Sequence, residues 1–234
     1  MIARHQALLP SSHSMLHIRP MWLACYPRSG SSFLRLILNQ AFGLRSTSLY
    51  EGEMARWEIA PGVAGLVGHY ERRRRNDAAG RTRLEIVKTN EPPLDNEPAI
   101  YLVRDGRSAI VSYFHYLNDI QGLPATLEEL IRGEIFPGFW ADHCKAWSPL
   151  HRPRTLLLRY EELTRSPKDA CNKIAGFLGE APLNNVTTTF GELHERFPAY
   201  FRCGDDGKNI AEIEPHKKLF DSIHGDAMRE FGYY

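Results

Sequence analysis

The feature that most constrains the fold is an apolar stretch that passes through a short polar loop into a helix. Residues 21–26 are apolar enough for a buried strand, and the loop 27–32 reads "PRSGSS". From Ser31 onward the apolar residues fall at helical spacing, and Gly43 suits the helix C-terminus. In such a unit, the backbone N–H groups of the loop and of the first helical turn point into one concavity. The positive end of the helix dipole points there as well. The segment therefore predicts an α/β unit with an anion site at the loop, to which Arg28 adds a full positive charge.

The loop differs from three familiar phosphate-binding loops. A triphosphate loop needs Gly-x-x-x-x-Gly-Lys-[Ser/Thr], which has no counterpart here. A cysteine phosphatase loop needs an arginine six positions after its cysteine, but Ser31 takes that place after Cys25. A dinucleotide fingerprint needs three glycines, and the loop has only Gly30. We expect a phosphate-like group bound without Walker-type magnesium handling, and the candidate residues are Arg28, Ser29, Gly30, Ser31 and Ser32. The alternative is a serine-capped helix after a tight turn.

The rest of the chain alternates strands with helices. Apolar runs predict strands at 84–88, at 99–105 and in 154–163, where the strand runs into a helix start. Helical spacing and capping residues predict helices at 106–117, 126–133, 139–147, 166–179 and 215–233. This order predicts a single α/β domain at 21–234, with a P-loop-like, mostly parallel sheet flanked by helices on both faces. We expect residues 1–20 to form a poorly ordered arm.

Composition and charge exclude several classes of protein. Of the 234 residues, 43% are hydrophobic and 24% charged, as in an ordinary globular domain. A net charge of +1 argues against a nucleic-acid partner for the chain as a whole. No apolar run approaches the ~20 residues of a membrane span, so we expect no membrane partner. Polar residues interrupt the N-terminal segment and the four cysteines are scattered, so we expect a cytoplasmic protein without a metal site.

Several motifs together resemble one family. "YPRSGSSFLR" (26–35) resembles the 5′-phosphosulfate loop of the sulfotransferases that use 3′-phosphoadenosine 5′-phosphosulfate (PAPS), both cytosolic-type and bacterial small-molecule enzymes. "YLVRDGRSAIVSYFHY" (101–116) is similar to the segment with which the family holds the 3′-phosphate. Further similar segments follow in the family's order, at 133–147, 156–163, 201–208 and 218–233. The resemblance thus covers residues 21–234.

The resemblance implies PAPS as donor, transfer of a sulfuryl group to a hydroxyl or amine of a small-molecule or natural-product acceptor, and no metal. It also implies donor-binding roles for residues outside the first loop. Arg104 and Ser112 stand where the family grips the 3′-phosphate, and Arg202 and Gly204 stand in its late phosphate loop: Cys203, between them, replaces a lysine. Phe33 replaces a tryptophan that stacks on adenine, and Tyr160 stands near the adenine.

Purely structural roles for the same residues stay open as alternatives. Phe33 also fits the core face of its helix, and Tyr160 also suits a packing aromatic at a strand end. Ser112 lies in mid-helix, where a hydroxyl can bond back to a carbonyl.

The catalytic residues depart from the family pattern. Arg28 replaces the usual lysine of the loop, so the charge is kept on a planar guanidinium. Lys88 ends a strand and is expected to aim its charge at the sulfuryl group. Asn90 stands where the family has its histidine base, and an amide cannot take up a proton near neutral pH. Glu91 or His69 replaces the base, or the acceptor is as acidic as a phenol, or activity is reduced or lost; we favour the first.

Two rival functions remain. One is a nucleotide-binding protein of the same fold whose transfer is reduced or lost because of Asn90. The other is a kinase of the wider P-loop group, against which the missing Gly-Lys-[Ser/Thr] counts.

Residues 44–83 are irregular and inserted between two strands, so we expect them to line the acceptor pocket. Trp140, His143 and Trp147 are expected to form a core stripe. The acceptor and the oligomeric state stay undetermined.

Overall fold

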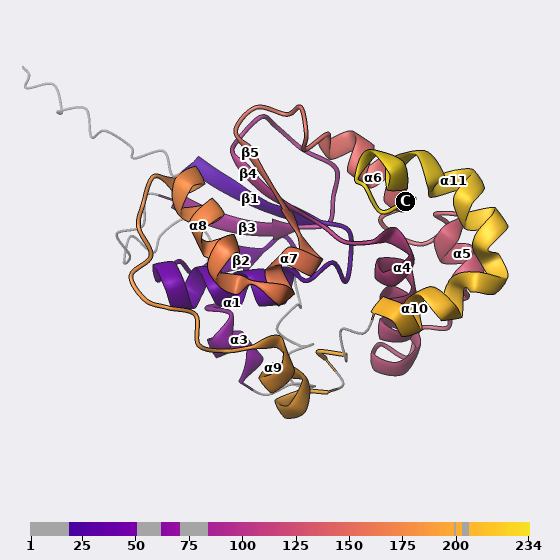
Figure 1. The fold of residues 1–234 in the computed structure, drawn as a ribbon, viewed down its shortest axis with the longest axis horizontal. Coiled ribbons are helices and arrows are strands. Elements are labelled where there is room, and N and C mark those ends of the chain that lie inside the picture. Colours follow the sequence, from indigo (N-terminus) through magenta and orange to yellow (C-terminus); the bar gives the residue numbers. More distant parts are fainter. Residues whose placement is uncertain (1–18, 51–61, 71–83, 199, 203–205) are drawn as a thin grey trace, which may run out of the picture.

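A parallel sheet forms the centre of the protein (Figure 1). The computed structural model describes residues 19–50, 62–70, 84–198, 200–202 and 206–234. Within these residues five strands pair in the order β2-β3-β1-β4-β5, all of them parallel. Their bounds are β1 (Arg19–Cys25), β2 (Ser46–Ser48), β3 (Leu84–Thr89), β4 (Ala99–Val103) and β5 (Thr155–Arg159). The predicted α/β domain with a parallel sheet is confirmed.

The central strand β1 brings three loops together. It pairs with β3 on one side and β4 on the other, with Ala24 opposite Thr89 and Cys25 opposite Leu102. The carboxyl ends of the three strands therefore lie at one edge of the sheet. The chain leaves β1 toward β2 and β3 and then crosses to β4 on the other side, which makes this edge a topological switch point, where ligands bind in open α/β sheets.

One face of the sheet is covered by α1 (Ser31–Phe42), α3 (Val63–Leu66) and α8 (Pro167–Leu178) (Figure 1). Helix α1 ends at Gly43, which has a left-handed φ of 65° and donates its N–H to Asn39 O, so the predicted helix ends as expected. Leu23, Leu34 and Ile174 are fully buried between these helices and the sheet. This layer fixes the start of α1 against the end of β1.

The other face is covered by α4 (Gly106–His115), α5 (Leu127–Ile131), α6 (Trp140–Trp147) and α11 (Lys217–Glu230). Trp140, His143 and Trp147 are all at most 3% exposed, which confirms the predicted core stripe on α6. A π-helical segment, η1 (Tyr116–Ile120), continues α4, and the remaining elements are α7 (Tyr160–Arg165), α9 (Phe190–Arg196), α10 (Asp206–Ile213) and the 3₁₀ helix η2 (Glu214–His216).

The expectation that residues 44–83 are irregular is wrong for the part that the structure describes. Strand β2 and helix α3 lie there, and β2 forms the edge of the sheet. The sequence of β2, "STS", is too short and too polar to be recognised as a strand. Ser46 and Thr47 of this strand are nevertheless buried, and Arg35 of α1 donates to Ser46 Oγ over 2.7 Å. Helices α9 and α10 were also not predicted.

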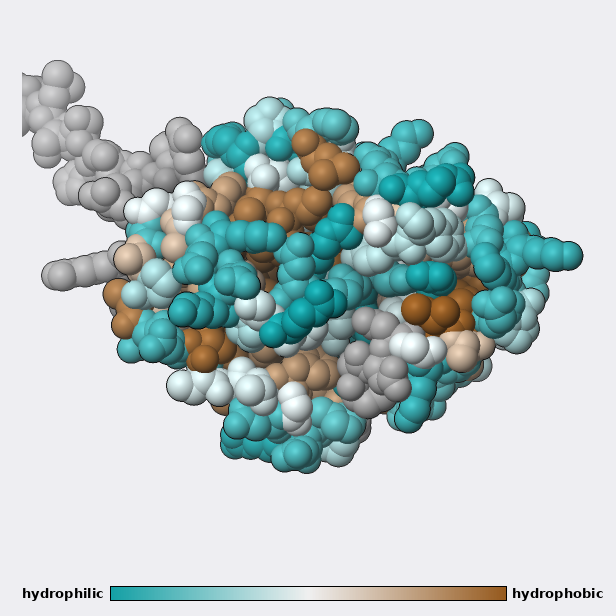
Figure 2. Space-filling model, in the orientation of Figure 1, coloured by the Kyte–Doolittle hydropathy of each residue, from teal (hydrophilic) through white to brown (hydrophobic). Residues whose placement is uncertain are grey.

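The surface is mixed in character. On the face seen in Figure 2 separate hydrophobic patches alternate with hydrophilic side chains. None of the helices in the described part of the chain is long and apolar enough to cross a bilayer.

Candidate active site

A cavity of about 420 Å³ opens at the carboxyl edge of β1, β3 and β4. Twelve of the predicted site residues line it, namely Arg28, Gly30, Ser31, Ser32, Phe33, Lys88, Asn90, Glu91, Arg104, Ser112, Tyr160 and Arg202. Ser29 lies just behind the wall, fully buried, and Gly204 lies outside the described residues. The structure thus gathers residues from six parts of the chain into one site.

The first turn of α1 is open toward this cavity. Gly30 has a φ of 100° and precedes the helix, and no side chain caps the helix among the described residues. The serines therefore do not serve as caps, in contrast to the alternative interpretation of the loop. Ser32 Oγ instead lies 3.1 Å from Tyr200 Oη, within hydrogen-bond distance. The uncapped N–H groups and the helix dipole leave this turn suited to an anion.

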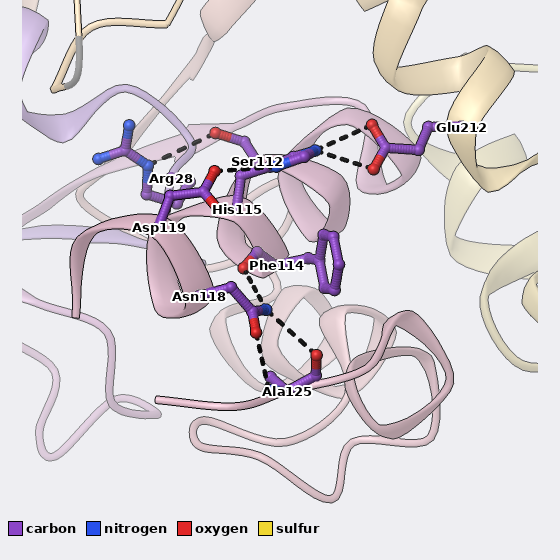
Figure 3. Close-up of polar contacts among 8 residues, drawn as sticks. All are labelled: Arg28, Ser112, Phe114, His115, Asn118, Asp119, Ala125 and Glu212. Atoms are coloured by element: carbon purple, nitrogen blue, oxygen red, sulfur yellow. Dashed lines mark hydrogen bonds and ion pairs between the residues drawn. The ribbon is translucent and has the colours of Figure 1, made fainter. Parts of the chain in front are cut away.

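The Arg28 side chain connects the loop to α4. Its Nε donates to Ser112 Oγ over 3.4 Å (Figure 3). Its Nη2 donates to Tyr200 O over 2.7 Å. The guanidinium carbon lies 4.9 Å from the ring centroid of Tyr116. Burial lowers the pKa of Arg28. A predicted loop residue and a predicted 3′-phosphate residue are therefore direct neighbours.

Two more guanidinium groups line the same cavity. Arg104 is only 4% exposed; its Nη1 donates to Arg28 O over 3.0 Å and its guanidinium lies 4.1 Å from the ring centroid of Tyr160. Arg202 Nη1 is buried and has no hydrogen-bond partner among the residues that the structure describes. A buried N–H donor without a partner is costly, so its position suits a ligand with acceptor oxygens. The residues present thus fit a ligand with more than one anionic group.

Helix α10 is held to α4 beside this cluster. His115 Nε2 lies 2.8 Å from Glu212 Oε1, and His115 Nδ1 lies 3.2 Å from Asp119 Oδ2 (Figure 3). This contact places Asn209, three residues before Glu212, in the cavity wall, where it is 7% exposed. A residue without any recognisable motif thereby joins the site.

Lys88, Asn90 and Tyr50 form a connected group at another part of the wall. Lys88 Nζ donates to Asn90 Oδ1 over 2.9 Å and lies 4.7 Å from the centroid of the Tyr50 ring. Asn90 Nδ2 donates to Cys25 O over 2.6 Å, and the Asn90 backbone N–H donates to Tyr50 Oη over 2.7 Å. Burial raises the pKa of Tyr50 to about 12, so this phenol stays protonated near neutral pH.

The two candidate bases are placed differently. Glu91 is half-buried in the cavity wall, and its carbonyl accepts a hydrogen bond of 2.9 Å from Trp147 Nε1. His69 does not line the cavity: it bridges to Ser46 at the edge strand, and its Nδ1 lies 2.7 Å from Arg35 Nη2. The structure therefore does not bring His69 to the site, because strands β2 and β3 separate the edge from β1.

Phe33 combines the two interpretations left open for it. Its side chain is fully buried in the core cluster of α1, and its ring meets that of Phe190 edge-on at 5.8 Å. It also contributes to the cavity wall.

Several residues of the cavity wall, most of them aromatic, were not predicted from the sequence. The missed residues that line the cavity include Tyr50, Tyr113, Tyr116, Gln121, Phe136, Phe190, Tyr200, Phe201 and Asn209. Of these residues, only Tyr113 and Tyr116 could have been predicted from the sequence. They lie close to Ser112 and three residues apart, on one face of the same predicted helix.

Comparison with known proteins gives a consistent result. The family model described as "Sulfotransferase domain" matches residues 19–193. Sulfotransferase 1B1 of Mus musculus is 43% identical over 86 residues, which are 34% of this chain and 29% of that protein. Sulfotransferase 1A1 of Rattus norvegicus is 28% identical over 180 residues, which are 68% of this chain and 59% of that protein. The chain thus spans less than two thirds of the length of these curated relatives.

Solved structures share the fold. Mouse sulfotransferase SULT7A1 complexed with PAP superposes with a TM-score of 0.68 at 22% identity, covering 91% of this chain and 86% of that one. Retinol dehydratase in complex with androsterone and inactive cofactor PAP gives a TM-score of 0.50 at 21% identity, covering 82% of this chain and 69% of that one. At these identities the similarity establishes the fold.

Proposed function

The chain belongs to the sulfotransferase domain family, and from this premise we propose that it transfers a sulfuryl group from PAPS to a hydroxyl or amine of a small-molecule acceptor. The observation that carries the proposal is the convergence of three guanidinium groups, one ammonium group and an uncapped helix N-terminus on one cavity. A donor with phosphate at two positions and a sulfuryl group needs this distribution of positive charge.

The donor residues are assigned from their places in the cavity. The loop 28–32 takes the 5′-phosphosulfate, while Arg104, Ser112 and Arg202 take the 3′-phosphate. Phe33 and Tyr160, both in the cavity wall, take the adenine ring. The SULT7A1 structure, which holds PAP, supports a nucleotide of this type. Ser29 Oγ is buried without a hydrogen-bond partner among the described residues, and the role of Gly204 stays a prediction.

The reaction forms one bond to sulfur and breaks another. The acceptor oxygen attacks sulfur, the bond from sulfur to the bridging phosphate oxygen breaks, and the departing phosphate gains negative charge. Arg28 and Lys88 supply positive charge where that charge develops. The acceptor proton goes to Glu91, the one candidate base in the cavity wall.

The acceptor end of the cavity favours small apolar or aromatic molecules. Tyr50, Tyr113 and Phe136 line it beside Lys88, and Phe136 is 47% exposed. Tyr113 Oη donates to Phe136 O over 3.0 Å, which ties this part of the wall to α4. The androsterone in the retinol dehydratase structure is a ligand of this general size and polarity.

Two measurements test the proposed function. Adenosine 3′,5′-bisphosphate should raise the melting temperature, whereas ATP with magnesium should not; the reverse result would favour the kinase. Labelled sulfuryl transfer should be detected with a panel of phenols, alcohols, sugars and amines. Binding of the bisphosphate without any transfer would favour the nucleotide-binding rival.

Variants of charged residues sharpen the test. Arg28→Ala should abolish transfer, and Arg202→Ala should weaken bisphosphate binding about 10- to 100-fold, the usual worth of a hydrogen bond to a charged group. Arg132→Ala is the matched control, because Arg132 pairs only with Glu128 on the surface of α5 among the described residues. Near-normal turnover of Arg28→Ala would refute its assigned role.

The base assignment has its own test. Glu91→Gln removes the carboxylate but keeps the shape of the side chain, and we expect transfer to slow by about 10²-fold or more. If the variant is as fast as the original with every acceptor, Glu91 is not the base, and the acidic-acceptor explanation gains support.

A further inference from the structure

The residue that stands in place of the family's histidine uses both polar atoms of its side chain in hydrogen bonds within the protein. We propose that Asn90 is a positioning residue that, together with the ring of Tyr50, clamps the Lys88 ammonium group in the cavity wall. This inference rests on the proposed function, since it concerns the charge that the transfer uses.

The Asn90 amide is oriented by its two partners. Its oxygen accepts from Lys88 Nζ at 2.9 Å, and its nitrogen donates to Cys25 O at 2.6 Å. An ammonium group only donates and a carbonyl only accepts, so the oxygen and nitrogen of the amide can be assigned in just one way. Because Cys25 is the last residue of β1, the amide is anchored to the end of the central strand.

Asn90 is also held by its backbone. Its N–H donates to Tyr50 Oη over 2.7 Å, and the residue is 7% exposed. Tyr50 is in turn placed by the strand before it, because Leu49 N–H donates to Lys88 O over 3.0 Å. The three residues are therefore mutually fixed by bonds that run between β2 and β3.

Lys88 is enclosed from two sides. The amide oxygen of Asn90 lies at one side of the ammonium, and the face of the Tyr50 ring lies 4.7 Å away at another. The ring attracts the ammonium through its quadrupole. A lysine side chain has four rotatable bonds, and a clamp that removes this freedom before binding lowers the entropic cost of placing the charge.

A neutral clamp suits a charge that must act on a ligand. A carboxylate at position 90 would hold the ammonium as well, but it would cancel the positive charge that the departing phosphate needs. An amide and an aromatic face hold the ammonium while leaving its net charge in place. The two groups also oppose any shift of Lys88 toward Glu91, whose side chain shares the cavity.

A double-mutant cycle tests the clamp. Asn90→Ala should lower kcat about 10- to 100-fold, the cost of one hydrogen bond to a charged group, and should leave the binding of adenosine 3′,5′-bisphosphate unchanged. In a Lys88→Met background the same Asn90→Ala change should have no further effect, because its target is gone. If the two losses multiply, or if Asn90→Ala acts on the KM of the acceptor, Asn90 touches the acceptor and the proposal fails.

Tyr50 provides a second test that leaves the buried bonds of the Asn90 side chain intact, should Asn90→Ala not fold. Tyr50→Phe keeps the ring face and loses only the hydroxyl, whereas Tyr50→Leu loses the face. We expect the Leu variant to lose at least five times more kcat than the Phe variant, and equal losses would contradict the clamp. Failure of the proposed function looks different: the original protein would show no transfer, or Lys88→Met would be fully active.

Discussion

Gly30 carries the tightest constraint on a single residue in the site. Its φ of 100° is left-handed, and a β-carbon placed on it would lie 2.5 Å from Tyr160 Cδ2. Two segments 130 residues apart, at Gly30 and Tyr160, meet here because the ring packs directly on the turn. Glycine is thus required at this position both by the left-handed backbone conformation and by the close packing of the Tyr160 ring.

Replacing this glycine should affect stability and donor binding together. Gly30→Ala forces an L-residue into the left-handed region, at a cost of roughly 1–2 kcal/mol, and displaces Tyr160 as well. We expect a lower urea midpoint of unfolding and a lower affinity for adenosine 3′,5′-bisphosphate. Gly179→Ala is the control, because Gly179 has a similar φ of 71° but nothing within 4 Å of the added carbon. The Gly179→Ala variant should be less stable but should bind the bisphosphate normally. Equal binding of the bisphosphate by Gly30→Ala and Gly179→Ala would contradict the role of the contact between Gly30 and Tyr160.

At the scale of elements, three segments lock the start of α4. Asp105 caps this helix by accepting from Arg107 N at 2.9 Å, and its own N–H donates to Glu161 Oε1 over 3.0 Å. Tyr233, after α11, donates to the other oxygen of Glu161 over 3.0 Å. The strand end that carries Arg104 is therefore braced by α7 and by the segment after α11.

The Tyr233 hydroxyl should matter for the proposed donor site although Tyr233 does not line the cavity. Tyr233→Phe keeps the ring, which faces the Arg159 guanidinium at 5.2 Å, and removes the hydrogen bond to Glu161. We expect a loss of about 1 kcal/mol in the free energy of unfolding and a few-fold weaker binding of adenosine 3′,5′-bisphosphate. Tyr234→Phe, which loses a bond to the surface residue Asp221, is the control for the binding titration. Identical binding by the two variants would show that the brace does not reach Arg104.

At the scale of the whole molecule, buried histidines tie the helical layer together. His224 of α11 is fully buried; its Nε2 donates to Ile131 O over 3.0 Å and its Nδ1 accepts from Ala141 N. His143 of α6 lies 2.8 Å from Tyr101 Oη in β4. Burial lowers the pKa of His143 to about 3 and that of His224 to about 4. Both side chains are therefore neutral in the folded protein at ordinary pH.

The folded protein should lose stability in mild acid for this reason. Unfolded histidine, with a pKa near 6.5, takes up protons below that pH while the folded state does not, so stability falls as the pH drops from about 6.5 toward 4. Each histidine should contribute a loss of about 2 kcal/mol at pH 5 relative to pH 8. His224→Gln should reduce the pH dependence of the urea midpoint, and His151→Gln, at an exposed position, should not. An unchanged slope in His224→Gln would contradict the assignment.

Much of the fold was predictable because it depends on local patterns. The helix after the opening loop begins at Ser31 and ends before Gly43 as predicted, and the Thr126–Glu129 capping box is present. Such features rest on contacts between residues three or four positions apart, which a sequence displays directly. The short polar strand β2 was missed because its three residues carry no apolar pattern and its pairing with β3 is a tertiary contact.

The sequence by itself determined the strand, loop and helix at the start of the domain, the parallel α/β arrangement and most of the residues proposed to bind the donor, since each follows from periodicity, small residues or a motif. Only the tertiary structure decided which groups meet at the site. It brings Tyr200, 172 positions away, to Arg28, uses both ends of the Asn90 amide within the protein, and leaves His69 at the sheet edge. The physical reason is that side-chain partners across such distances are set by how the layers pack, and no local pattern records that packing.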